Sequence, residues 1–83
     1  MSDVDLYESR ETIPVELDGI DIYERGGAVK NPFSGEVVEL DGLALSIYDA
    51  IKGAEAFQQY GIVRAGCDWF RQFEPEAYMK LLD

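Results

Sequence analysis

Apolar and polar residues alternate on both sides of Asp18-Gly19, which is the period of a half-buried β-strand. The apolar positions are Ile13, Val15, Leu17, Ile20 and Ile22. Asp18-Gly19 favours a two-residue type I′ turn, in which both central residues need a positive φ. We therefore predict a β-hairpin over residues 13–24, with Pro14 on an edge strand because proline cannot donate to a ladder.

Two further strands are predicted before residue 41. Gly26-Gly27 favours a second turn, followed by a short strand around Val29. Residues 31–36, with the sequence NPFSGE, form a loop by their Asn-Pro, Ser and Gly content, and residues 37–40 form the next strand. The N-terminal half is thus predicted to be a small antiparallel hairpin or meander over residues 12–40.

From residue 43 the apolar period becomes helical. Asp41 is a suitable N-cap, and the apolar stripe after it consists of Leu43, Ile47, Ala50, Ile51, Ala54 and Phe57. Gly53 interrupts this stripe, and we expect it to admit the close approach of a neighbouring helix. Gly61 is expected to end the helix, because glycine tolerates the left-handed conformation found at helix ends.

A second helix is predicted over residues 62–73. Its stripe contains Ile62, Gly66, Trp69, Phe70 and Phe73, and an aromatic stripe at helical spacing is usually buried. Pro75 suits the first position of a third, short helix. A small antiparallel sheet over residues 12–40 and two or three helices over residues 43–82 predict an α+β fold, with residues 12–83 as one domain and residues 1–11 as a flexible acidic arm.

Negative charge is concentrated near the N-terminus. The chain has 17 Asp and Glu against 7 Lys and Arg, a net charge of -10, and Arg10 is the one base among residues 1–24. Such a chain lacks the basic surface that binds nucleic acid or anionic membranes, so we expect neither as a direct partner. A protein with a basic surface is the expected partner, and self-association stays open. The candidate partner-binding residues are Asp3, Asp5, Glu8, Glu11, Asp18, Asp21, Tyr23 and Glu24.

The residue types argue against an enzyme. Histidine is absent, which removes the commonest general base and metal ligand, and Cys67 is the one cysteine. Cys67 lies on the apolar side of its helix, where burial makes a thiol inert. Asp3 and Asp5 begin like a calcium loop, but the glycine and glutamate that such a loop needs further on are missing. We therefore expect no catalytic residues, no metal and no cofactor.

Three stretches resemble a group of small proteins encoded by tailed bacteriophages. They are NPFSGEVVEL, YDAIKGAE and GCDWFRQFEPEAYMKLLD, and together they contain the pattern NPFSGE…YD…DWFR…YMKLLD. The residues that carry the resemblance are Asn31-Pro32-Phe33, Gly35-Glu36, Tyr48-Asp49, Gly53, Asp68-Trp69-Phe70-Arg71 and Tyr78-Met79 with Leu81-Leu82-Asp83. The resemblance covers residues 31–83 and leaves residues 1–30 outside it. It implies a phage gene and a protein of the host cytoplasm, but no activity.

These observations leave four functions open. The first is a non-catalytic acidic module that binds and modulates, by inhibition, a host protein such as an enzyme acting on nucleic acid. The second is a structural or assembly component of a virion, and the third is a DNA mimic that occupies a basic groove. A hydrolase that uses carboxylates comes last, because no pair of acids stands out from the others. An acidic N-terminus and the lack of any apolar run of about 20 residues fit a cytoplasmic protein.

Overall fold

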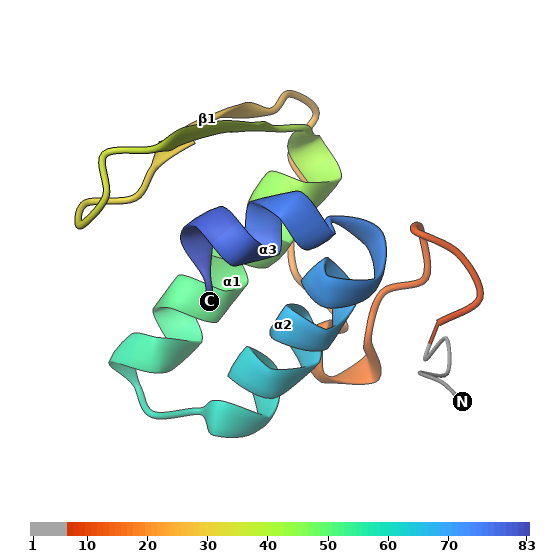
Figure 1. Cartoon of the computed structure of the whole chain (residues 1–83). Coiled ribbons are helices and arrows are strands. Elements are labelled where there is room, and N and C mark those ends of the chain that lie inside the picture. The colour runs from red at the N-terminus through yellow and green to blue at the C-terminus, as the bar shows by residue number, and fades with distance from the viewer. Residues whose placement is uncertain (1–6) are drawn as a thin grey trace, which may run out of the picture.

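The structure is a computed structural model that describes residues 7–83, and it has an α+β fold (Figure 1). A 3₁₀ turn, Val15–Leu17, precedes a two-stranded antiparallel sheet of β1 (Gly27–Lys30) and β2 (Val37–Leu40). Three helices follow: α1 (Gly42–Ala56), α2 (Tyr60–Phe73) and α3 (Pro75–Leu81). α2 packs against both α1 and α3, and β2 lies against α1 and α3. The predicted fold class, a small hairpin followed by helices, is confirmed.

The hairpin lies later in the chain than the alternating pattern predicts. β1 and β2 pair from Gly27 opposite Leu40 to Lys30 opposite Val37, and residues 31–36 form the loop between them. The loop at 31–36 and the strand at 37–40 agree with the prediction. The predicted turn at Gly26-Gly27 is wrong, because Gly27 already belongs to β1.

The predicted hairpin at residues 13–24 is also wrong, and its turn explains why. Asp18 has φ -60° and ψ 134°, and Gly19 has φ +92°, which are the angles of a type II turn. A type II turn splays the flanking strands, whereas a type I′ turn matches their twist. Ile20 N–H bonds to Leu17 C=O at 3.2 Å and Leu17 N–H to Pro14 C=O at 2.8 Å, so the backbone groups here are satisfied locally.

Burial along this stretch does not alternate as it would in a strand. Leu17 and Pro14 are fully buried, whereas the side chain of Val15 is 81% exposed. Leu17 belongs to the same core as the helices, and the turn at Val15–Leu17 lies against α2. Leu17 is therefore buried by packing against α2, and the segment does not form one face of a sheet.

The helix ends follow the predicted chemistry in part. Asp41 caps α1 by accepting a hydrogen bond from Ala44 N–H at 3.0 Å, and Pro75 opens α3, both as predicted. The prediction that Gly61 ends the first helix is wrong, since α1 stops at Ala56 and Gly61 lies in the first turn of α2. Gln58, with φ 59°, takes the left-handed position instead, and Gln59 N–H bonds to Ala54 C=O at 2.8 Å to close the helix end.

The core forms where α1 and α2 cross. Its largest fully buried side chains include Trp69 and Phe70 of α2 and Ile47 and Ile51 of α1. The rings of Trp69 and Phe70 meet edge to face, with centroids 5.1 Å apart. Burial of Trp69 and Phe70 confirms that this aromatic pair is core, as the helical spacing predicts.

Gly66, and not Gly53, is the glycine that lets the two helices approach. A Cβ atom built on Gly66 would lie 2.4 Å from Cγ1 of Ile51, whereas one on Gly53 would meet nothing within 4 Å. The expectation for Gly53 is therefore wrong. A periodic pattern gives the face of a helix but does not reveal which glycine on the two helices lies at their crossing point.

These two glycines provide a matched pair of substitutions. Gly66→Ala should lower the free energy of unfolding, because overpacking against a fully buried isoleucine costs about 1–3 kcal/mol and exceeds the gain in helix propensity. Gly53→Ala should raise it by about 0.5–1 kcal/mol, since only the propensity changes. Urea unfolding of both variants, followed by circular dichroism, measures the difference. Equal effects would show that α1 and α2 do not cross at Gly66.

Candidate functional site

The candidate site is the segment of residues 7–24, which contains most of the predicted partner-binding residues. In Figure 1 the segment runs beside α2 and then passes behind α1 to reach the hairpin. Its one regular element is the short turn Val15–Leu17. Side chains at three places, Tyr7, Arg10 and Tyr23, connect it to the helices, and they determine which parts of the segment remain free to meet another molecule.

Tyr7 is held by the side chain of Gln72 in α2. The amide of Gln72 accepts a hydrogen bond from Tyr7 N–H at 3.1 Å and donates one to Tyr7 C=O at 2.7 Å. Through these two bonds the side-chain amide pairs with the backbone as a neighbouring strand would. The ring of Tyr7 lies near Phe73, with centroids 6.5 Å apart, and burial raises the pKa of its hydroxyl.

Arg10 connects the segment to Asp41, Glu74 and Trp69. Its Nη2 atom lies 2.9 Å from Oδ1 of Asp41 and 2.8 Å from Oε2 of Glu74, and its guanidinium lies over the ring of Trp69 at 5.3 Å from the centroid. Its backbone C=O accepts a hydrogen bond from Nε1 of Trp69 at 3.0 Å. The single base of this segment is therefore directed toward acids of other elements.

The Arg10 contacts alter the acid chemistry of Asp41. The hydrogen bond from Arg10 holds the pKa of this carboxyl below its ordinary value of 3.8, and the hydrogen bond from Ala44 N–H acts in the same direction. Burial acts in the opposite direction but does not overcome them. Asp41 thus remains a carboxylate that both caps α1 and binds Arg10.

Tyr23 anchors the far end of the segment to α1. Its backbone N–H donates to Oγ of Ser46 at 2.7 Å, and its hydroxyl donates to Oδ2 of Asp49 at 2.7 Å, which raises the pKa of the phenol. The backbone at Tyr23 passes so close to the start of α1 that a Cβ atom built on Gly42 would lie only 2.0 Å from the Tyr23 carbonyl oxygen. The position of Tyr23 is therefore fixed, while its side chain stays 42% exposed.

Between these anchors the carboxylates point to solvent. All six acids of residues 7–24 are exposed, and none forms an ion pair within residues 7–83: Glu8, Glu11, Glu16, Asp18, Asp21 and Glu24. Five of them are predicted partner-binding residues, as is Tyr23. The remaining two, Asp3 and Asp5, lie outside the described residues. We name this set of six carboxylates the acidic ribbon.

The helices show the opposite arrangement of charge. Each helix contains an ion pair between a cation and an acid of its own: Lys52 with Glu55 at 3.1 Å in α1, Arg71 with Asp68 in α2, and Lys80 with Glu76 at 3.7 Å in α3. Such exposed pairs contribute little to stability, but they neutralise the surface locally. Unpaired negative charge is therefore a property of the ribbon more than of the helical face.

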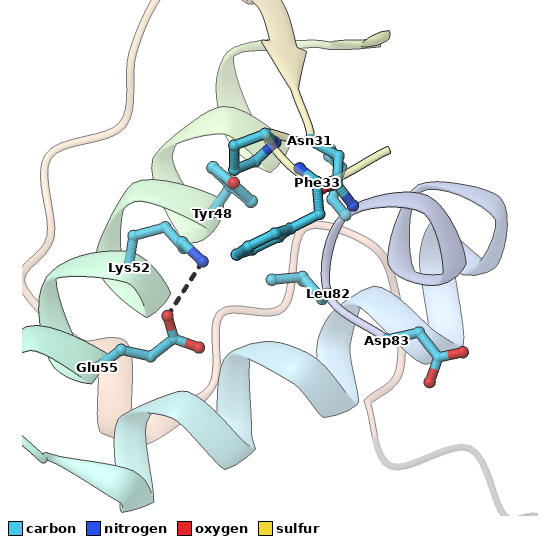
Figure 2. Close-up of a pocket in the computed structure, with 9 residues that line it drawn as sticks. Asn31, Phe33, Tyr48, Lys52, Glu55, Leu82 and Asp83 are labelled. Carbon is cyan, nitrogen blue, oxygen red and sulfur yellow. Dashed lines mark hydrogen bonds and ion pairs between the residues drawn. The ribbon is translucent and has the colours of Figure 1, made fainter. Parts of the chain in front are cut away.

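A hollow at the tip of the hairpin is a second feature of the surface, and sequence reasoning did not identify it. Its volume is about 330 Å³, and its lining includes Phe33 of the hairpin loop, Tyr48 of α1 and Leu82 beyond α3 (Figure 2). The side chain of Phe33 is 97% exposed. The signal that could have identified it is an aromatic residue in the middle of a polar turn, at Asn31-Pro32-Phe33.

The described residues include no group of three His, Cys, Asp or Glu side chains that could hold a metal ion. Cys67 is half-buried against the core, and burial raises the pKa of its thiol. No helix among residues 7–83 has the length and apolar character needed to cross a membrane.

Comparison of the chain with protein-family models, with curated proteins and with solved structures gives no match.

The Arg10 contacts can be tested against a second arginine of the chain. Arg10→Ala should lower the free energy of unfolding by about 1.5–3 kcal/mol, the range for hydrogen bonds to charged groups. Arg25→Ala should change it by less than about 0.5 kcal/mol, because Arg25 is exposed and has no ion pair within residues 7–83. Thermal and urea unfolding measure both. A small effect of Arg10→Ala would show that the segment is not held by this side chain.

The same contact predicts a dependence on acid. A carboxyl whose pKa is depressed in the folded state stabilises the fold above its unfolded pKa, and this contribution is lost as the pH falls through the folded pKa. Ionised Asp41 should therefore make its full contribution to the stability of the fold above pH 3.8, its ordinary pKa, and a progressively smaller one at lower pH. As the pH falls below 3.8, the difference in unfolding free energy between the parent and Arg10→Ala should shrink. Urea unfolding from pH 7 down to about 2 checks this, and a difference that stays constant would contradict it.

Proposed function

We propose that this chain is a non-catalytic protein-binding module that uses the acidic ribbon to bind a partner with a basic surface. The observation that carries the proposal is the segregation of charge. Six exposed carboxylates that have no ion pair within residues 7–83 lie on one segment, whose single base is turned to acids of other elements. The cations of α1, α2 and α3 that form ion pairs do so within their own helices.

Fixing the ribbon on the helices favours binding. Like charges on one segment repel one another and oppose the compact state, so a stable fold gains nothing from gathering them. The contacts of Tyr7, Arg10 and Tyr23 nevertheless hold the segment in place. A segment held in position before binding loses less conformational entropy on association than a free tail does. The arrangement suits the recognition of a complementary, positively charged surface.

Apolar groups lie among the acids. Val15 is 81% exposed and sits next to Glu16, while Ile22 and Tyr23 are also exposed, next to Asp21 and Glu24. The buried centre of a protein interface is enriched in aromatic and apolar side chains and depleted of charge, with polar groups around it. The ribbon thus combines charges that accelerate encounter with apolar groups that can be buried after it.

The resemblance to phage proteins gives the setting of the proposal. In the cytoplasm of an infected bacterium, enzymes acting on nucleic acid expose basic grooves, to which an acidic ribbon is complementary in charge. Binding at such a groove would block access of the nucleic acid and inhibit the enzyme. The function proposed is therefore inhibition of a host protein of this class.

The test is copurification from phage-infected cells, with the tagged chain as bait, followed by binding kinetics with the protein recovered. Recovery of a host nucleic-acid enzyme supports the proposal. Recovery of capsid or tail proteins would instead support a virion component. Competition between the chain and DNA for the groove of that enzyme is expected both of the proposed inhibitor and of a DNA mimic.

Kinetics with that partner give a sharper prediction. Neutralisation of two ribbon acids in Glu8→Gln/Glu11→Gln should slow association several-fold at low salt, because opposite fields steer encounter. The effect should fade as salt rises from about 0.05 to 0.5 M, where the Debye length falls well below 10 Å. The control, Glu39→Gln/Glu76→Gln, changes the net charge equally but away from the ribbon. Equal slowing by both variants would show that only the total charge matters.

A further inference from the structure

Phe33 is the most exposed of the large hydrophobic side chains in the described part of the chain, at 97%. It lies at the tip of the hairpin, in the loop between β1 and β2. Leaving a phenyl ring in water forgoes the favourable free energy of burying it. An isolated exposed apolar residue is ordinary, but this one has a fixed support and a hollow beside it.

The support is the side chain of Asn31. Its Oδ1 atom accepts hydrogen bonds from Phe33 N–H at 2.8 Å and Ser34 N–H at 3.3 Å, and its Nδ2 atom donates to Lys80 C=O at 2.8 Å. The backbone of Asn31 makes two more bonds across the loop, with Glu36 C=O and Gly35 N–H, both at 2.8 Å. The loop is therefore shaped by one residue and fastened to α3, which holds the backbone of Phe33 in one place.

The hollow lies between the loop, α1 and the end of α3. Figure 2 shows the ring of Phe33 extending across it, with Tyr48 and Lys52 on one side and Leu82 on the other. Its volume of about 330 Å³ is at the lower end of the range for small-ligand pockets, and is large enough for one big side chain. Its lining combines apolar side chains, among them Phe33, Tyr48 and Leu82, with polar and charged ones.

The charge of the lining favours a cationic neighbour. Three charged residues line the hollow, Lys52, Glu55 and Asp83, and Lys52 is already paired with Glu55 at 3.1 Å. Asp83 has no ion pair within residues 7–83, so one negative charge is left over. The chain as a whole carries a net charge of -10. A second copy of this chain would be repelled, whereas a segment with lysine or arginine beside its apolar residue would be attracted.

The hollow lies near the end of the segment that carries the acidic ribbon. The hydroxyl of Tyr23 bonds to Asp49, which adjoins Tyr48 on α1, and Tyr48 lines the hollow. The C-terminal end of the ribbon and the hollow thus lie on adjacent sides of one helix. A single partner surface can cover both, with charge contacts along the ribbon and one apolar contact at the hollow.

From these observations we infer that the hollow beside Phe33 receives one large apolar side chain, flanked by Lys or Arg, from the same basic protein partner. The inference rests on the proposed function and adds to it the apolar anchor of the interface. In protein interfaces a few aromatic residues in well-packed pockets supply most of the binding free energy. Phe33 and Tyr48 are the residues that would supply it here.

The probe is a short, capped synthetic peptide with a central tryptophan between lysines, compared with the same peptide carrying alanine at the centre. Binding is measured by backbone amide shifts at about 0.15 M salt. The tryptophan peptide should shift the amides of Phe33, Tyr48 and Leu82 and bind about tenfold more tightly than the alanine peptide. Phe33→Ala should weaken its binding about tenfold, as loss of a hot-spot side chain does.

Phe57→Ala is the matched control, because Phe57 is also a phenylalanine in a loop and is 78% exposed, but does not line the hollow. It should leave binding unchanged, and neither substitution should alter the melting temperature. Equal binding of the two peptides, with shifts confined to Glu8–Glu24, would overturn the inference and leave the proposed function standing. No binding of either peptide would count against both. A tryptophan peptide flanked by glutamates that binds as tightly, or a dimer that depends on Phe33 in sedimentation, would also overturn the inference.

Discussion

The guanidinium of Arg10 links the N-terminal segment to three separate places on the helical part of the fold. It binds Asp41 at the start of α1 and Glu74 at the junction of α2 and α3, and it covers the ring of Trp69. The indole N–H of Trp69, the largest buried side chain, donates a hydrogen bond to the backbone C=O of Arg10. A buried donor without a partner costs free energy, so the position of the N-terminal segment and the integrity of the core depend on each other.

Helices were easier to predict from the sequence than strands, for a physical reason. The aromatic stripe of α2, the cap at Asp41 and the start at Pro75 are local signals, and each has the predicted role. Alternation before residue 24 was misleading, because Leu17 is buried by α2 and not by a neighbouring strand. The period of a short apolar pattern cannot distinguish these two kinds of contact, and tertiary context decides between them.

The candidate site was predictable in its charge but not in its shape. The excess of acids from Glu8 to Glu24 can be read directly from the sequence, and the structure places these acids on the surface. Nothing local indicates that Gln72 would pair with the backbone of Tyr7, or that Phe33 would stand beside Tyr48 and Leu82. These contacts join residues far apart in sequence, and they exist only because the helices have already packed.

The contacts of Gln72 and Glu74 with Tyr7 and Arg10 also set an order of events during folding. They span 64 or 65 positions along the chain, and closing a loop of that length costs conformational entropy before any contact compensates for it. On the ribosome, the N-terminal segment is made first but cannot dock until residue 74 has been synthesised and has left the exit tunnel. Throughout that interval its acids repel one another, which favours an extended and solvated segment over a compact one until α2 has formed.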